Sequence, residues 1–363
     1  MKYNISKNSK QKAYMQLYLE VRREILEGKL KYGSKLLSKR LMAEECGVSV
    51  VTVKSAYDIL CDEGYVESRE RSGYYVIYRS TDFISVPEEP HDTVLSGSYI
   101  PSKYDFPFSV LAKTMRKVIS DRAQGILTKS PNNGMKELRE AIASYLDRSM
   151  GIRCGERQII IGSGAEYLYS LIARLFSFVF GNRCIFAIEK PSYEMIKKVY
   201  TASGFECEEL EIGKHGIRTG ALESSKANVL HVTPFNSYPS GITASATKRA
   251  QYLDWANKNN AFIVEDNYES ELTVSSKPED TLFSLSDGNV IFLNTFSQTI
   301  SASMRIGYMV LPEALLDIFE KNLGFFSCTV TVFEQYVLAE LIESGEFERH
   351  ISKVRRAKRR SMV

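Results

Sequence analysis

The segment NTFSQTISASMRIG, residues 294–307, is rich in small hydroxylated side chains, and its one fully charged residue is Arg305. Apolar runs precede and follow it, which predicts a loop between two strands. Hydroxyls, backbone N–H groups and a guanidinium in one loop are suited to holding an anion. The long side chain in its middle, Gln298, is an amide and cannot act as an amine nucleophile.

Further residues that could bind a ligand follow other apolar runs. They are Gly162-Ser163-Gly164-Ala165, Pro191-Ser192-Tyr193, Thr233-Pro234, Tyr238-Pro239-Ser240-Gly241 and Glu265-Asp266-Asn267-Tyr268. Glycine-rich backbone at the start of a helix binds phosphate through free N–H groups. A carboxylate can hold a protonated pyridine nitrogen, and an aromatic side chain can stack on a flat ring. Each feature alone is more often structural, so the prediction depends on their occurring together.

These residues need a scaffold that brings them to one place. Near-continuous apolar strands are expected at 158–164, 183–191, 228–234, 261–268, 289–296 and 306–312, with helices at 136–149, 165–180, 192–204 and 248–260. This alternation is typical of an α/β domain with a mainly parallel sheet. Ligands of such sheets bind at the carboxyl ends of the strands, where all these segments fall.

The first eighty residues have a different pattern. Three helical segments, 14–28, 38–47 and 49–64, precede two short strands at 65–70 and 73–78. The second and third helices begin with serine, a favoured N-cap residue. Three helices followed by a two-stranded wing predict a winged helix-turn-helix domain, whose third helix enters the major groove of DNA.

This stretch resembles the GntR-type DNA-binding domain. The matching positions are Gly28, Gly33, Leu36, Ser38, Arg40, Ala43, Val48, Ser49, Thr52, Val53, Tyr57, Leu60, Glu63, Gly64, Gly73 and Val76. Leu37 replaces the family's proline, and Val50 replaces an arginine that approaches DNA. The DNA contacts that the resemblance implies are Arg40, Ser49, Thr52, Lys54 and the wing around Gly73. Val51 and Val53 are expected to be core residues.

The remainder resembles fold type I aminotransferases, which bind pyridoxal phosphate (PLP). A GntR-type head on such a body is the pattern of MocR-type transcriptional regulators, which the chain resembles over nearly its whole length. By this resemblance the phosphate is held by Gly164, Ala165, Ser297 and Arg305, the ring stacks on Tyr193, its nitrogen faces Asp266 and its oxygen faces Tyr268. Ser237 replaces the glutamine usual before the Tyr238–Gly241 turn.

The family's Ser-Lys-Thr pattern carries the lysine that bonds covalently to PLP, and here the same place reads Ser297-Gln298-Thr299. An amide can neither form that bond nor shuttle the proton of transamination. We therefore predict no catalytic residue and no transaminase activity. PLP, if held, is expected to be noncovalent, either alone or already joined to an amino acid.

The predicted organisation is a DNA-binding domain at 1–78, a linker at 79–100 and an aminotransferase-like domain at 101–363. Residues 1–80 carry 15 Lys and Arg against 10 Asp and Glu, a net charge of +5, which favours nucleic-acid binding. Residues 348–363 carry 7 Lys and Arg against 1 Glu. This basic segment is either the solvated face of a helix or a further nucleic-acid-binding tail.

The family resemblance implies a small C-terminal subdomain with an arginine that clamps the substrate carboxylate. The chain stops at Val363, inside the helix expected to lead into that subdomain. Two explanations stay open, a naturally shortened gene and an incomplete sequence.

The bulk composition narrows the class of protein. No run approaches the roughly 18 apolar residues of a membrane span, and the N-terminus lacks the apolar core of a secretory signal. The six cysteines are scattered without a CxxC pair, which favours reduced thiols in a cytoplasm and argues against a structural metal site.

We expect a cytoplasmic regulator that binds double-stranded DNA as a homodimer, with PLP or its amino-acid adduct as effector and no membrane partner. Two alternatives are a PLP-dependent aminotransferase with an accessory DNA-binding domain, and a decayed DNA-binding protein without ligand sensing. Visible absorbance of the protein mixed with PLP would separate them.

Overall fold

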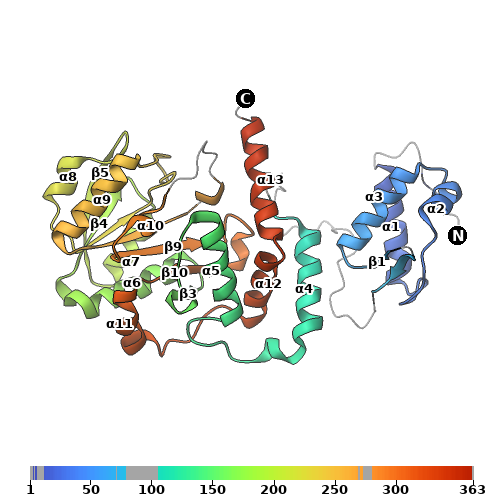
Figure 1. Ribbon diagram of the computed structural model, residues 1–363, viewed down its shortest axis with the longest axis horizontal. Helices are drawn as coiled ribbons and strands as arrows, with labels where there is room; N and C mark the ends of the chain where they lie inside the picture. The colour runs from blue at the N-terminus through green and yellow to red at the C-terminus, as the bar shows by residue number, and fades with distance from the viewer. Residues whose placement is uncertain are drawn as a thin grey trace. The chain divides into compact units, whose positions relative to one another are not determined.

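The computed structural model describes residues 3, 5, 12–70, 72–78, 105–268, 270–272 and 280–361, apart from the side chains of Asn182 and Ser361 (Figure 1). The linker predicted at 79–100 lies outside the described residues. The chain divides into two compact units. The first comprises Met1–Ile100 and Pro107–Asp121, and the second comprises Pro101–Phe106 and Arg122–Val363.

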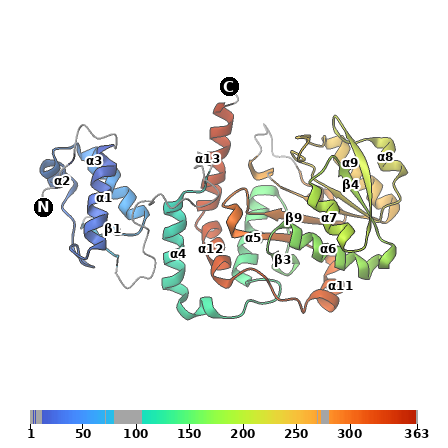
Figure 2. The same ribbon diagram turned by 180° about the vertical axis from the view of Figure 1, so that it is seen from behind.

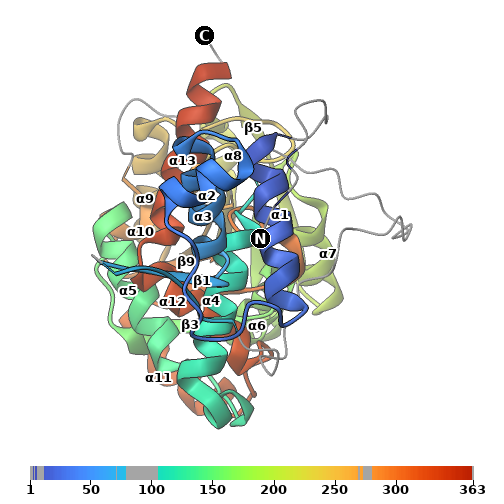
Figure 3. The ribbon, with the colours of Figure 1, turned by 90° about the vertical axis from the view of Figure 1, so that its right-hand side faces the viewer.

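The first unit contains a winged helix-turn-helix. Its elements are α1 (Ala13–Leu26), α2 (Lys39–Cys46), α3 (Val50–Asp62), β1 (Val66–Arg69) and β2 (Gly73–Val76), and α4 (Phe108–Arg122) belongs to this unit as far as Asp121. Helices α1 and α3 lie side by side (Figure 3). The two strands pair antiparallel and form the predicted wing.

Local sequence signals account for the helix starts of this unit. Ser38 accepts a hydrogen bond from the backbone N–H of Leu41, and Ser49 accepts one from that of Thr52, at 3.3 and 3.1 Å. Both are N-caps, as predicted. The expected core position of Val53 is confirmed, but that of Val51 is wrong, because Val51 is 72% exposed. Two residues apart on a helix, the two valines point in different directions, and only one can face the core.

The second unit is built on an eight-stranded sheet with the order β3-β10-β9-β8-β7-β4-β5-β6. Strands β9, β8, β7, β4 and β5 run parallel to one another, whereas β10 is antiparallel to β9 and β3, and β6 is antiparallel to β5. The strands are β3 (Ile159–Gly162), β4 (Ile185–Lys190), β5 (Glu206–Gly213), β6 (Gly216–Ile217), β7 (Val229–Val232), β8 (Phe262–Asp266), β9 (Val290–Thr295) and β10 (Gly307–Val310). The mainly parallel sheet is as predicted.

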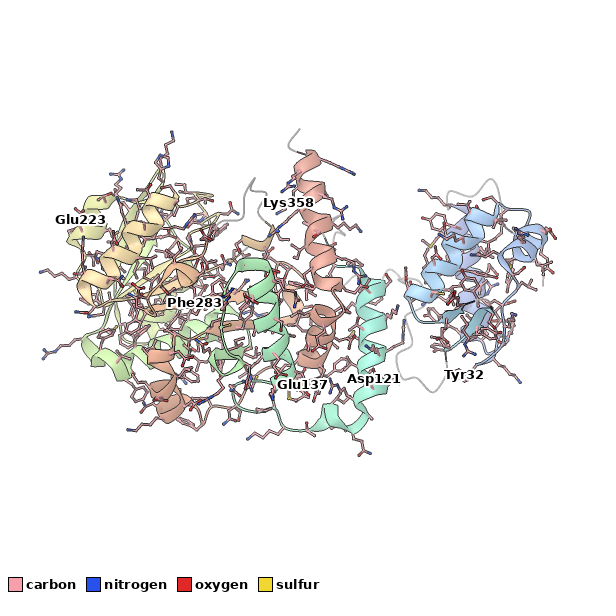
Figure 4. The ribbon with its side chains drawn as sticks, viewed as in Figure 1. Tyr32, Asp121, Glu137, Glu223, Phe283 and Lys358 are labelled. Carbon is pink, nitrogen blue, oxygen red and sulfur yellow. The ribbon has the colours of Figure 1, made fainter. Side chains whose placement is uncertain are left out.

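Helices cover both faces of this sheet (Figures 1 and 2). Helices α6 (Ala165–Phe180), α7 (Glu194–Ala202) and α11 (Glu313–Leu323) share one hydrophobic core with the strands. Helices α8 (Thr219–Ser224), α9 (Ala246–Asn259) and α10 (Leu282–Leu285) share the core of the other face. Figure 4 labels Glu223 on α8 and Phe283 on α10. Helices α5 (Lys136–Met150), α12 (Val332–Glu343) and α13 (Glu346–Ser361) pack beside the β3 end.

Strand β5 was not among the predicted strands. Its sequence, ECEELEIG, holds four glutamates, and its side chains are mostly exposed or half-buried. It lies near the edge of the sheet, where only β6 follows it. A strand in that position needs few apolar residues, so the apolar pattern that reveals central strands is missing.

Candidate functional site

A cavity of about 410 Å³ opens in the second unit at the carboxyl ends of the parallel strands. Its lining residues are Ala165, Glu166, Tyr169, Tyr193, Thr233, Tyr238, Asp266, Tyr268, Thr295, Ser297, Gln298, Ala302 and Arg305. Six of the seven residues predicted to bind a cofactor are in this set. The seventh, Gly164, lies directly behind it, because a Cβ atom there would come within 2.8 Å of Nη2 of Arg305.

The floor of the cavity is a buried carboxylate. Asp266, the last residue of β8, is 3% exposed. The hydroxyl of Tyr169 on α6 donates a hydrogen bond to its Oδ2 atom. Nε2 of His231, a buried residue of β7, lies 3.6 Å from the same oxygen, and the Nδ1 atom of this histidine is hydrogen bonded to Tyr200. Tyr169 thus holds the carboxylate by a hydrogen bond, whereas Nε2 of His231 is close to it but makes no hydrogen bond to any described residue.

One side of the cavity holds an ion pair that the sequence did not reveal. Nη2 of Arg305 lies 2.7 Å from Oε2 of Glu166, and the hydroxyl of Tyr193 donates to Oε1 of Glu166 at 3.0 Å. Although burial by itself raises the pKa of Glu166, hydrogen bonds from its own backbone N–H, Arg305 and Tyr193 outweigh it and lower the pKa. The Glu166 carboxylate is therefore charged at neutral pH.

Another part of the cavity lining is formed by neutral side chains. The Gln298 amide donates a hydrogen bond to the hydroxyl of Tyr268. Ser297, beside it, is half-buried and also lines the cavity. No lysine lines the cavity among the residues that the structure describes.

Ser237 does not line the cavity. It is 1% exposed, and its hydroxyl donates to Oε2 of Glu189 at 2.8 Å, which also accepts from the backbone N–H of Thr233 at 3.1 Å. Burial raises the pKa of Glu189 to about 7, despite these two hydrogen bonds. Ser237 therefore contacts a buried acid at the end of β4, where the resemblance would place a glutamine contact to the ligand.

The five residues predicted to contact DNA all lie in the first unit. Arg40 is exposed in the first turn of α2. Ser49 and Thr52 lie at the start of α3, and Ser49 uses its hydroxyl as the helix cap. Lys54 is 61% exposed and lies 3.6 Å from Asp58. Gly73 opens strand β2 with a φ of 114°, a conformation that favours glycine.

At the wing, the structure places two cations against the ring of Tyr75. The guanidinium of Arg69 lies 4.6 Å from the ring centroid of Tyr75, and Nζ of Lys35 lies 5.7 Å from the same ring. Such contacts hold long cationic side chains in place beside an aromatic ring. Lys35 reaches Tyr75 because the two residues form an isolated antiparallel bridge, a long-range pairing that the sequence pattern does not show.

Other site residues were missed for a different reason. Tyr169 and Glu166 lie in the first two turns of α6, where the sequence reads as an ordinary amphipathic helix. A usable signal was available for His231, which is the one polar residue of the otherwise apolar strand VLHV. A polar residue in a buried strand usually has a specific partner.

Both units match known families. The family "Bacterial regulatory proteins, gntR family" matches residues 13–76, and "Aminotransferase class I and II" matches residues 102–362. An HTH-type transcriptional regulator of Bacillus subtilis, YdeL, is 32% identical over 96% of this chain and 78% of its own length. The probable rhizopine catabolism regulatory protein MocR of Rhizobium meliloti is 28% identical, covering 94% of this chain and 74% of its own length.

Solved aminotransferases share the fold of the second unit. A kynurenine aminotransferase of Pyrococcus horikoshii superposes with a TM-score of 0.63 at 26% identity, over 69% of this chain. The match spans 64% of that enzyme's length.

The protein is thus a GntR-type winged helix joined to a fold type I, aminotransferase class I and II domain. This combination defines a family of HTH-type regulators, and the chain belongs to the MocR-type group of that family. Within the described residues, no helix is long and apolar enough to cross a membrane.

Proposed function

We propose that this protein is a DNA-binding transcriptional regulator whose aminotransferase-like unit senses a small molecule and does not catalyse transamination. The observation that supports the proposal is Gln298, which lines the cavity and bonds Tyr268, at the position where the family resemblance places the lysine of an aminotransferase. Its amide supplies neither a nucleophile nor a base at neutral pH. The first unit supports the DNA-binding part, because it presents exposed Arg40 and Lys54 near the starts of α2 and α3.

DNA binding is tested by fluorescence anisotropy with duplexes from the region upstream of the protein's own gene. Arg40→Ala and Lys54→Ala should each weaken binding about five- to tenfold and make it less steeply dependent on salt, because each removes a phosphate contact. Lys29→Ala is the matched control, since Lys29 and Lys54 are each 61% exposed and each lies near a carboxylate. If both variants bind as tightly as the parent, the assignment of the interface is wrong.

The cavity fits the ring of PLP better than its phosphate. Asp266 can hold a protonated ring nitrogen, Tyr193 can stack on the ring and Tyr268 can face a ring oxygen. Gly164, Ala165, Ser297 and Arg305 would hold the phosphate, but Glu166 already bonds the guanidinium of Arg305. When bound, PLP supplies an electrophilic aldehyde on an electron-withdrawing ring.

We accordingly propose noncovalent binding of a pyridoxal-type ligand, alone or as its amino-acid adduct, through these residues. The absorbance spectrum of the parent with PLP should show no band of a Schiff base with the protein. Borohydride should therefore attach no cofactor to the cavity. A reducible, stoichiometric cofactor in the parent would instead favour the aminotransferase alternative.

We also propose a two-fold homodimer in the cytoplasm, because fold type I domains assemble around their ligand sites and DNA-binding dimers read paired half-sites. Sedimentation velocity at micromolar concentration checks this. A single monomeric species would refute it.

A further inference from the structure

Glu166 is the second residue of α6 and lines the cavity at the place where a fold type I domain holds a phosphate. Arg305 and Tyr193 hydrogen bond to its two carboxylate oxygens, Oε2 and Oε1, at 2.7 and 3.0 Å. The backbone N–H of Glu166 is also hydrogen bonded to this side chain. A guanidinium, a phenol and a helix N-terminal N–H are the donors that would otherwise bind a ligand anion.

Close packing keeps this arrangement compact. Gly164 has a φ of 92°, and a Cβ atom at this position would approach Nη2 of Arg305 to 2.8 Å. The guanidinium therefore lies directly against the turn that begins α6, with the carboxylate of Glu166 bonded to it. The guanidinium of Arg305, the phenol of Tyr193 and the N–H of Glu166 already bond an anion, and that anion belongs to the chain.

The charges of the cavity lining also disfavour a ligand phosphate. Among the described lining residues, Glu166 and Asp266 are the carboxylates and Arg305 is the one guanidinium or ammonium group. The lysine place holds a neutral amide, Gln298. A phosphate bound at Arg305 would add about two negative charges beside Glu166, and like charges at short range oppose each other.

We propose that Glu166 takes the place of a ligand phosphate, so that the cavity selects a phosphate-free, cationic pyridine ligand over its phosphate ester. The protonated ring nitrogen would face Asp266. Four tyrosines of the lining, Tyr169, Tyr193, Tyr238 and Tyr268, suit a flat cation, because aromatic faces attract positive charge. This inference rests on the ligand site of the proposed function and names the class of ligand that it accepts.

The test compares pyridoxamine with pyridoxamine 5′-phosphate by calorimetric titration of the full chain. These amine forms do not react with surface lysines. The parent should bind pyridoxamine at least about tenfold more tightly than the phosphate ester, because the ester must displace or repel Glu166. Glu166→Gln should strengthen binding of the ester about tenfold or more, since it frees Arg305, and should thereby abolish the parent's preference for pyridoxamine.

Glu194→Gln is the matched control. Glu194 opens α7 next to Tyr193, but its side chain is 73% exposed and bonds Lys198 at 2.8 Å. This variant should keep the parent's order of affinities. If Glu166→Gln fails to fold, the parent's own order of affinities still decides the proposal.

Each outcome has one meaning. If the parent prefers the phosphate ester, the inference about ligand preference is wrong, but the proposed ligand site is still supported. A parent that prefers pyridoxamine, with no change in Glu166→Gln, overturns the role of Glu166. Binding of neither compound overturns both the inference and the sensing part of the proposed function, while the DNA titration tests the regulator part separately.

Discussion

Helices α3 and α6 begin in opposite electrostatic settings. The N-cap of α3 is the neutral hydroxyl of Ser49, and the residues after it, Val50 and Val51, are 44% and 72% exposed. At the start of α6, the charged side chain of Glu166 pairs with Arg305. The first N–H groups of both helices have no acceptor inside the helix, and both ends carry the positive end of the helix dipole.

We infer from this difference that a helix end binds an outside anion where the chain has not supplied its own. On α3 the end is open, and the exposed Lys54 follows one turn later, which suits a polyanion such as DNA. On α6 an internal carboxylate occupies the donors. The first unit is accordingly expected to bind anions, and the second to bind a ring without one.

The largest expected effect comes from placing a lysine in the cavity with Gln298→Lys. Its amine can condense with the aldehyde of pyridoxal or PLP, releasing water, and the phenol of Tyr268 is in place to hydrogen bond the new side chain. The intact mass after borohydride reduction should show about one pyridoxal adduct per chain. The parent should carry no adduct at this site.

Gln124→Lys, an exposed position outside the cavity, measures nonspecific labelling. If Gln298→Lys gains no more label than this control, the cavity does not accept the ring. The decayed-protein alternative would then be favoured.

The next effect concerns the cavity floor. Asp266→Asn keeps the shape of the side chain and an acceptor for Tyr169 but removes the charge that a protonated ring nitrogen needs. Pyridoxamine affinity should fall about 30-fold or more, since charge-assisted hydrogen bonds are worth about 2 kcal/mol. Asp287→Asn, an exposed position, should leave calorimetric binding unchanged. Equal affinities in all three proteins would mean that the ring is held elsewhere.

A smaller effect concerns pH, because burial raises the pKa of Glu189 from 4.5 to about 7. The folded state then prefers the protonated acid. Its stabilising contribution is fully present below pH 4.5, falls as the pH rises toward 7, and is absent above that.

Glu189→Gln removes this titration, and its amide oxygen can accept both hydrogen bonds that Oε2 of Glu189 accepts. Relative to the parent, the variant should therefore gain about 1–3 kcal/mol of stability between pH 5 and pH 8. Urea unfolding followed by the fluorescence of Trp255 reports on the second unit, because Trp255 is the chain's single tryptophan and lies in α9. Parallel pH profiles of the two proteins would contradict the prediction.

The smallest effect is expected at the open helix end. Val50→Arg adds a cation at an exposed position at the start of α3 and should raise DNA affinity about fivefold. Tyr32→Arg adds the same charge elsewhere on the first unit, at a residue that is 54% exposed (Figure 4). If both substitutions raise DNA affinity equally, the gain comes from the added net charge and not from placing that charge at the start of α3.

Residues with local causes could be predicted. Ser38 and Ser49 could be predicted as caps because serine is a favoured N-cap residue, and each accepts a hydrogen bond from a backbone N–H three residues on. Strands β8 and β9 were located because the apolar runs 262–264 and 290–293 lie within the predicted ranges 261–268 and 289–296. In contrast, Val51 was misjudged, since its apolar side chain gives no indication of which way the helix faces.

The sequence by itself determined the two domain types, the absence of a lysine at position 298, and the set of residues placed at strand ends. Those features depend on residue type and on spacing within a few residues. The tertiary structure alone decided that Glu166 meets Arg305, 139 residues away, and that Tyr169 meets Asp266, 97 residues away. Such pairs form because the order of the sheet brings α6, β8 and the loop before β10 to one cavity, and that order is set by packing of the whole domain.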